Sequence, residues 1–188
     1  MKVKVSLPEV MFRETDPTSV ALMRRALRDI LAKEQMPILE ECIDNGDRAV
    51  CPDYIALSLD LQDLTFVECV GDKSAIGTTI KKYIERLKGY PFKKLIVYAY
   101  EPYKNKTEHF VRDGWFVKVL ITNRVIRKPY IVVDYEIVRR IIETWLSKKD
   151  EIRERFDIST NRLFDTFYTI YELIEQDDMF KELVIWSK

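Results

Sequence analysis

The chain has 188 residues, 47% of them hydrophobic, and its 31 basic side chains balance 31 acidic ones. This length and apolar content suffice for one core, so we expect a single α/β core with a helical appendage. No apolar run approaches the roughly 20 residues of a membrane span, and the stretch MKVKVSLPEVMF does not resemble a secretory signal. We therefore expect a cytoplasmic protein. The abundance of Ile, Lys, Arg, Glu and Tyr, with few Gln and Gly, favours a thermophilic source.

The charges are distributed unevenly along this neutral chain. Residues 73–149 carry 18 basic and 7 acidic side chains, a net charge of +11, whereas the segments on either side are acidic. A solvated surface is the ordinary reading of any one charged cluster, but a block this uneven is typical of proteins that bind a polyanion, so the charge pattern favours a polyanionic partner.

The cysteines predict neither a disulfide framework nor a zinc site. Cys42, Cys51 and Cys69 are odd in number, form no CxxC pair, and have only His109 as an imidazole partner. We expect three buried thiols. His109 lies in the polar stretch KNKTEHF, which predicts a solvated loop.

The first third of the chain is predicted to be helical. Asp16-Pro17 is a typical helix start, and apolar residues at helical spacing then predict a helix over 17–35. Pro37 interrupts it, the stretch ILEECI (38–43) predicts a short helix, and Asn45-Gly46 is expected to end that helix.

An α/β arrangement with a mixed sheet flanked by helices is predicted for the middle of the chain. Residues 48–70 contain two extended segments separated by a turn at 61–63, which indicates a hairpin. A helix is predicted from Ser74 to Gly89, and the apolar run KKLIVYAY then indicates a strand covered on both faces. The crossover between the second and third strands is long enough for a right-handed parallel connection.

Two more strands, WFVKVLIT and PYIVV, are predicted on either side of a basic loop at 123–128, and Asp134 is expected to cap the following helix. From residue 150 the pattern is helical and acidic. We therefore divide the chain into a core at 1–149 and a helical extension at 150–188 that packs on the core. A homodimer interface on the extension is the alternative.

Two carboxylates mark a candidate site. Asp53 begins the first strand of the hairpin and Glu68 ends the second, so the two side chains can lie at the same end of the sheet. Counted from a turn at Gln62, the two positions are about nine and six residues away, so a bulge or register offset is expected between them. Paired carboxylates are the ligands that Mg²⁺ and Mn²⁺ prefer.

The order of these elements resembles the PD-(D/E)XK nuclease superfamily, which includes the archaeal Holliday-junction resolvases. The resemblance covers about residues 20–100: an acidic first helix, Pro52-Asp53, Glu68, and the helix and strand that follow. It implies a restriction-endonuclease-like core, Asp53 and Glu68 as Mg²⁺ or Mn²⁺ ligands, and hydrolysis of DNA phosphodiester bonds in branched or structured duplexes.

The chain departs from the family pattern two residues after Glu68, where Val70 stands in place of the family's lysine. Valine can neither position water nor stabilise an anion, so another base must replace the lysine, or the site is inactive. Lys73 is the nearest candidate, and Lys81 or Lys82 on the following helix are the others. The acidic residue that the family often adds from its first helix corresponds to Glu41, with Glu40 and Glu34 as alternatives.

DNA phosphates are expected to contact basic side chains of the positive block. The candidates are Lys81, Lys88, Lys93, Arg124, Arg127 and Lys128. If Val70 marks a lost site, the chain is instead a non-catalytic nucleic-acid-binding or assembly protein with a nuclease-like fold. A small adaptor that docks through an aromatic C-terminal helix is a third reading.

Overall fold

The computed structural model describes residues 49–123 except Leu59, and residues 147–158. It also describes five short segments, of which all but 42–43 are described by their backbone alone, and several single positions. These are residues 2–6, 38–39, 42–43, 130–134 and 185–187, and Thr18, Ala21, Leu22, Arg25, Ala26, Asp29 and Glu143.

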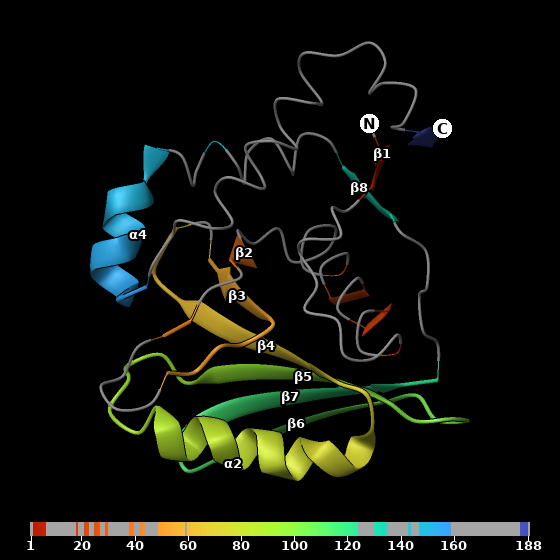
Figure 1. Ribbon diagram of the computed structural model, residues 1–188, viewed down its shortest axis with the longest axis horizontal. Coiled ribbons are helices and arrows are strands. Elements are labelled where there is room, and N and C mark those ends of the chain that lie inside the picture. Colours follow the sequence, from red (N-terminus) through yellow and green to blue (C-terminus); the bar gives the residue numbers. More distant parts are fainter. Residues whose placement is uncertain are drawn as a thin grey trace.

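A six-stranded mixed sheet forms the centre of the molecule, with strand order β2-β3-β4-β5-β7-β6 (Figure 1). Its strands are β2 (Ile38–Leu39), β3 (Tyr54–Leu57), β4 (Leu64–Val70), β5 (Lys94–Tyr100), β6 (Lys106–Arg112) and β7 (Trp115–Thr122). The pairs β4–β5 and β5–β7 are parallel, and the other pairs are antiparallel. The predicted α/β class with a mixed sheet is therefore confirmed.

One face of the sheet is covered by a short 3₁₀ turn, η3 (Lys73–Ala75), and the helix α2 (Ile76–Arg86). The Asp72 carboxylate accepts the Ser74 backbone N–H at 2.6 Å and begins this helical segment. The buried face of α2 includes Ile80 and Tyr83. The Tyr83 ring lies 5.3 Å from that of Phe66 on β4, which itself lies 5.9 Å from Trp115 on β7. This aromatic cluster fixes α2 against the sheet.

The described residues of the predicted helix at 17–35 lie against the opposite face. Within the predicted range 17–35, every described residue is helical, and Leu22, Ala26 and Asp29 are buried. Asp29 accepts the Tyr98 hydroxyl at 3.4 Å, and Arg25 donates to Thr122 Oγ1 at 2.8 Å. Residues on alternate positions of β5 point to opposite faces, so Tyr98 points away from α2.

A second, three-stranded sheet has the order β8-β1-β9, all antiparallel. It consists of β1 (Lys2–Ser6), β8 (Tyr130–Asp134) and β9 (Ile185–Ser187). The predicted strand PYIVV is thus present but belongs to this sheet. Residues 185–187 were expected to be helical, and that expectation is wrong because they pair with β1.

The helix α4 (Lys149–Phe156) agrees with the helical pattern predicted from residue 150. Phe156 is buried, its ring lies 4.9 Å from that of Phe92, and its carbonyl accepts the Tyr90 hydroxyl at 2.7 Å. This part of the extension packs on the core. The predicted helix after Asp134 and most of the extension, residues 159–184, lie outside the described residues. Among the helices in the described part of the chain, none is long and apolar enough to cross a membrane.

The helix predicted for ILEECI is wrong. Ile38–Leu39 pairs with Ile55 and Ala56 as β2, and Ile43 exchanges two backbone hydrogen bonds with Val50, at 2.8 and 2.9 Å. Pairing with a neighbouring strand overrides the helical spacing in this short stretch.

The same pairing brings Cys42 opposite Cys51, and the two form a disulfide with a Cα–Cα distance of 4.1 Å. The prediction of three thiols is therefore wrong for this pair, whereas Cys69 is free and buried as expected. A spacing of nine residues is not diagnostic in itself. The pairing of Ile43 with Val50, a tertiary feature, makes the bridge possible.

The stretch KNKTEHF (104–110) was predicted as a loop, but its residues from Lys106 onward belong to the strand β6, and His109 is an exposed strand residue. Asp113 and Gly114 connect β6 to β7 with φ of +49° and +79°, the two positive values of a type I′ turn. An Asp-Gly pair between extended segments is a known hairpin signal, so the sequence contained the information that the loop prediction missed.

Replacing Gly114 with Ala is expected to lower the free energy of unfolding by about 1–2 kcal/mol, because a β-carbon is strained at positive φ. Apart from Gly114 and its two chain neighbours, no residue has an atom within 4 Å of the added carbon, so the effect should come from the backbone alone. Urea denaturation measures it. Gly89→Ala, which is equally unobstructed and has no positive φ, is the control and should change stability by less than about 0.5 kcal/mol.

Candidate functional site

The hairpin register places Asp53 directly opposite Glu68. Tyr54 pairs with Val67, and the next positions along the two strands are Asp53 and Glu68. The Asp53 backbone N–H donates to Glu68 Oε2 at 3.3 Å, and Asp53 Oδ2 accepts the Cys69 backbone N–H at 2.6 Å. The structure thus brings together the two acidic residues that the sequence singled out.

The expected bulge is absent from this hairpin, because the turn is centred one to two residues earlier than Gln62. Leu57 pairs with Leu64, which places the centre between Asp60 and Leu61. Ser58 Oγ accepts the backbone N–H groups of Gln62 and Asp63, at 3.0 and 2.9 Å. These bonds define the loop, and the loop defines the register that aligns the carboxylates.

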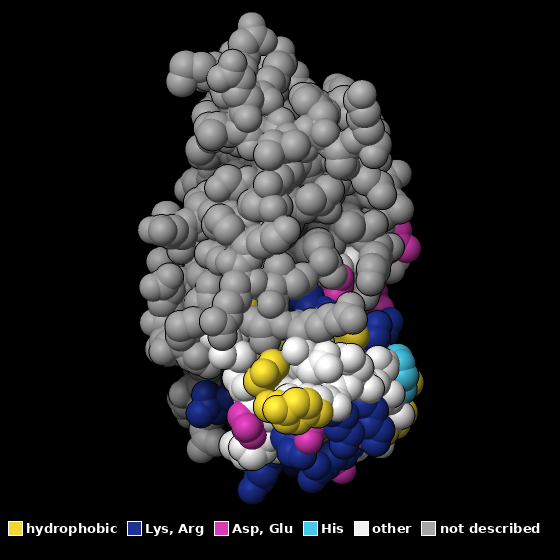
Figure 2. All heavy atoms as spheres, turned by 90° about the vertical axis from the view of Figure 1, so that its right-hand side faces the viewer, with side chains coloured by type: hydrophobic (Ala, Val, Ile, Leu, Met, Phe, Trp, Pro, Cys, Tyr) yellow, Lys and Arg dark blue, Asp and Glu magenta, His cyan; other side chains and the backbone are white. Residues whose placement is uncertain are grey.

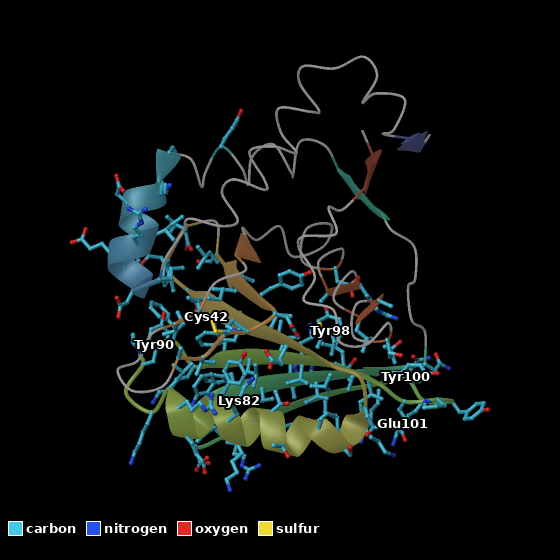
Figure 3. The ribbon with its side chains drawn as sticks, viewed as in Figure 1. Cys42, Lys82, Tyr90, Tyr98, Tyr100 and Glu101 are labelled. Atoms are coloured by element: carbon cyan, nitrogen blue, oxygen red, sulfur yellow. A yellow bond between two sulfur atoms is a disulfide. The ribbon has the colours of Figure 1, made fainter. Side chains whose placement is uncertain are left out.

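Two consecutive residues of α2 contact the Glu68 carboxylate. Lys82 Nζ lies 2.5 Å from Glu68 Oε1, and the Tyr83 hydroxyl donates to Glu68 Oε2 at 2.9 Å. The Lys82 ammonium also lies 5.0 Å from the centroid of the Tyr83 ring. Figure 3 shows Lys82 between α2 and the sheet. The Glu68 and Lys82 side chains are 14% and 30% exposed, so solvent and a ligand can still reach the pair.

The other two candidate lysines lie elsewhere. Lys73 pairs with Glu101, after the end of β5, and Lys81 pairs with Glu85 at 3.6 Å on the exposed side of α2. Val70, in the position of the family's lysine, pairs with Ala99 and packs against the core. Of the three lysines proposed from the sequence, Lys82 is the one beside Glu68.

Burial and the two carboxylates raise the pKa values of two neighbouring side chains, Tyr83 and Cys69. Burial raises the pKa of the Tyr83 hydroxyl well above its usual range, and the negative charge of Glu68 raises it further. Burial, with the charges of Asp53 and Glu68, likewise raises the pKa of the Cys69 thiol well above its usual range. Tyr83 therefore remains a hydrogen-bond donor to Glu68 at neutral pH, and Cys69 remains a thiol, which is a poor metal ligand and nucleophile.

The shifted pKa of Tyr83 predicts a loss of stability in alkali. Above about pH 10 a tyrosine of the unfolded chain releases its proton, whereas Tyr83 in the folded chain retains it. The unfolded state then binds fewer protons, so the free energy of unfolding falls as pH rises, by up to about 1.4 kcal/mol per pH unit for this group.

Urea denaturation at pH 9 and pH 11 measures this loss. The difference between the two pH values should be smaller in Tyr83→Phe than in the wild type. Tyr103→Phe is the control, because Tyr103 is 99% exposed. An equal pH dependence in Tyr83→Phe and the wild type would contradict the assignment.

The structure describes half of the proposed phosphate contacts. Lys81 and Lys88 are exposed, and Lys93 is half-buried. Arg124, Arg127 and Lys128 lie outside the described residues, as do Glu34, Glu40 and Glu41. Figure 2 shows Lys and Arg side chains gathered on the described part of one face. Lys73 and Lys104 both pair with Glu101. The continuous basic surface stays a prediction.

Sequence reasoning missed Tyr83 as a site residue. Its helical spacing assigned it to the core, and its ring is indeed buried there. Only the packing of α2 against β4 shows that the Tyr83 hydroxyl reaches Glu68.

The donor set at this site fits Mg²⁺ or Mn²⁺. Within the described residues, no three His, Cys, Asp or Glu side chains gather into a metal-binding group. Mg²⁺ is commonly held by one or two carboxylates, with water and phosphate oxygens as its other ligands, and Asp53 and Glu68 supply two.

Because comparisons with known proteins give no match, any assignment of function rests on the geometry of this site. No protein-family model, curated protein or solved structure matches the chain.

Proposed function

We propose that the chain is a Mg²⁺- or Mn²⁺-dependent endonuclease that hydrolyses DNA, with branched or structured duplexes as candidate substrates. The observation that supports this function best is the Asp53–Glu68 pair with the Lys82 ammonium against it. A carboxylate pair can hold the metal for phosphodiester hydrolysis, and an adjacent lysine can stabilise the charge that develops on the phosphate.

In this proposal Asp53 and Glu68 would hold the cation, which when bound would polarise the scissile phosphate and lower the pKa of the attacking water. Lys82 stabilises the negative charge that develops on the phosphate, because its ammonium carries three donors and already lies at the site. Tyr83 holds Glu68 Oε2 in place, and the Cys69 backbone N–H holds Asp53 Oδ2. These bonds limit the reorganisation of the site during the reaction.

Substrate phosphates lie against the basic block in this proposal. Binding is then independent of sequence and weakens as salt rises. Lys81, Lys88 and Lys93, together with Arg124, Arg127 and Lys128, are the residues assigned to these contacts.

Cleavage of supercoiled plasmid and of a synthetic four-way junction tests the function directly. We expect nicking in Mg²⁺ or Mn²⁺ and none in EDTA, with activity restored when the metal is returned. Absence of cleavage in either metal, on a folded protein that still binds the junction, would overturn the endonuclease proposal.

Lys82→Ala is expected to lower the single-turnover cleavage rate about 10²-fold, because a preorganised cation at the developing charge is lost. DNA affinity should change little, since one phosphate contact among many is a small part of binding. Lys73→Ala is the matched control, because its ammonium group pairs with Glu101 instead. Unchanged cleavage in Lys82→Ala would exclude this role.

The second candidate function is binding of nucleic acid without catalysis, in a nuclease-like fold. The apolar Val70 beside Glu68 favours it. Filter binding with and without Mg²⁺, run beside the cleavage assay, separates the two functions. A protein that only binds should hold the DNA equally well without Mg²⁺ and leave it uncut, although its binding still weakens as salt rises.

A further inference from the structure

Strand β6 is the outer edge of the six-stranded sheet within the described residues. Six of its seven residues are exposed and the seventh, Glu108, is half-buried. Apolar side chains are exposed at this edge as well: Phe110 is 37%, Val111 62% and Phe116 of the neighbouring strand 61% exposed. Unpaired strand edges with exposed apolar residues are templates for pairing with another chain.

The hairpin determines which backbone groups of β6 face outward. In a type I′ turn the first residue accepts from the fourth, so Arg112 and Trp115 form a hydrogen-bonded pair. Hydrogen bonding alternates along an antiparallel strand, so Phe110 and Glu108 also bond to β7. Thr107, His109 and Val111 then direct their N–H and C=O groups toward the outer edge.

The charges of β6 select one register for antiparallel pairing of two copies. With Phe110 opposite the partner's Phe110, Glu108 lies opposite the partner's Arg112, and His109 lies opposite the partner's Val111. The outward-facing groups of His109 and Val111 then meet those of the partner. Opposite charges across a strand pair stabilise it, as do aromatic pairs.

The neighbouring registers lack this match. If the two strands are centred on His109, Lys106 lies opposite the partner's Arg112. If they are centred on Glu108, that residue lies opposite the partner's Glu108. Like charges directly opposite one another are destabilising. Registers that set His109 opposite the partner's Phe110 are unfavourable for another reason. The outward-facing N–H and C=O groups of His109 would then meet a residue whose own backbone groups bond to β7.

We propose that two copies of this chain associate through antiparallel pairing of β6, with Phe110 on the two-fold axis and Glu108 opposite the partner's Arg112 on either side. The two six-stranded sheets then become one continuous sheet. A cavity of about 370 Å³ adjoins this edge and is lined in part by His109, Val111 and Phe116. The inference is independent of the proposed nuclease activity, because it uses none of the residues of that site.

Charge reversal tests the register. By sedimentation at concentrations from 5 to 200 µM, the wild type should form dimers within that range. Glu108→Arg and Arg112→Glu should each weaken the dimer at least tenfold, because each sets like charges opposite one another. The double variant Glu108→Arg/Arg112→Glu restores opposite charges and should dimerise again. Thermal melting of each variant identifies any that fail to fold.

Cysteine cross-linking gives a second, register-specific measurement. Phe110→Cys should form a disulfide-linked dimer under mild oxidation, because residue 110 faces itself across the axis. Glu108→Cys alone should not, whereas a mixture of Glu108→Cys and Arg112→Cys should. A wild type that is monomeric at 200 µM, a dimer that is insensitive to both charge reversals, or a folded double variant that stays monomeric would overturn the proposed pairing.

Discussion

Glu68→Gln is expected to lower metal-dependent DNA cleavage by about 10³-fold or more. The substitution keeps the shape of the side chain but removes the charge that holds the cation and that pairs with Lys82. Single-turnover cleavage of a labelled four-way junction measures the rate. DNA binding should be unchanged or tighter, because a negative charge leaves a site that receives phosphates.

Asp53→Asn should have a similar effect on cleavage, and Glu85→Gln is the matched control on the exposed side of α2. Because Asp53 also accepts the Cys69 backbone N–H, its variant needs a parallel measurement of stability. Full cleavage activity in a folded Glu68→Gln protein would remove Glu68 from the reaction and favour the non-catalytic function.

Phe66→Ala is expected to lower the free energy of unfolding by about 3–5 kcal/mol. The side chain is fully buried and its ring contacts those of Tyr83, Tyr90 and Trp115, so the substitution leaves a cavity between α2 and the sheet. Urea denaturation gives the value. Tyr103→Ala removes an aromatic ring that is 99% exposed and should change stability by less than about 0.5 kcal/mol. Equal effects of the two substitutions would mean that the aromatic cluster does not stabilise the core.

The elements that the sequence predicted well are those with a strong local pattern. The hairpin around β3 and β4, the helix α2 and the apolar strand β5 each carry their own periodicity. The prediction failed where a neighbouring strand decides the conformation. The stretch ILEECI has helical spacing but pairs with β3, and the disulfide follows from that pairing.

The sequence predicted which two acidic residues form the candidate site, but not how they and the neighbouring lysine are arranged. Asp53 and Glu68 follow from their places at the ends of two strands, whereas their alignment depends on a loop held by Ser58. The choice among the lysines depends on how α2 is rotated against β4, which is a tertiary property. Aromatic packing of Tyr83 on Phe66 sets that rotation and places Lys82 beside Glu68.

The two sheets differ in the length of chain that their pairings enclose. In the six-stranded sheet Phe66 pairs with Leu95, 29 positions later, and Leu95 pairs with Val117, 22 positions later. In the small sheet Lys4 pairs with Val132 and with Ile185, 128 and 181 positions later. Contacts between distant segments form more slowly, because a longer loop must close first. During synthesis on the ribosome, β1 can therefore pair only after β8 and β9 have been made. The large sheet, with Asp53 and Glu68 in place, can fold before β9 is made.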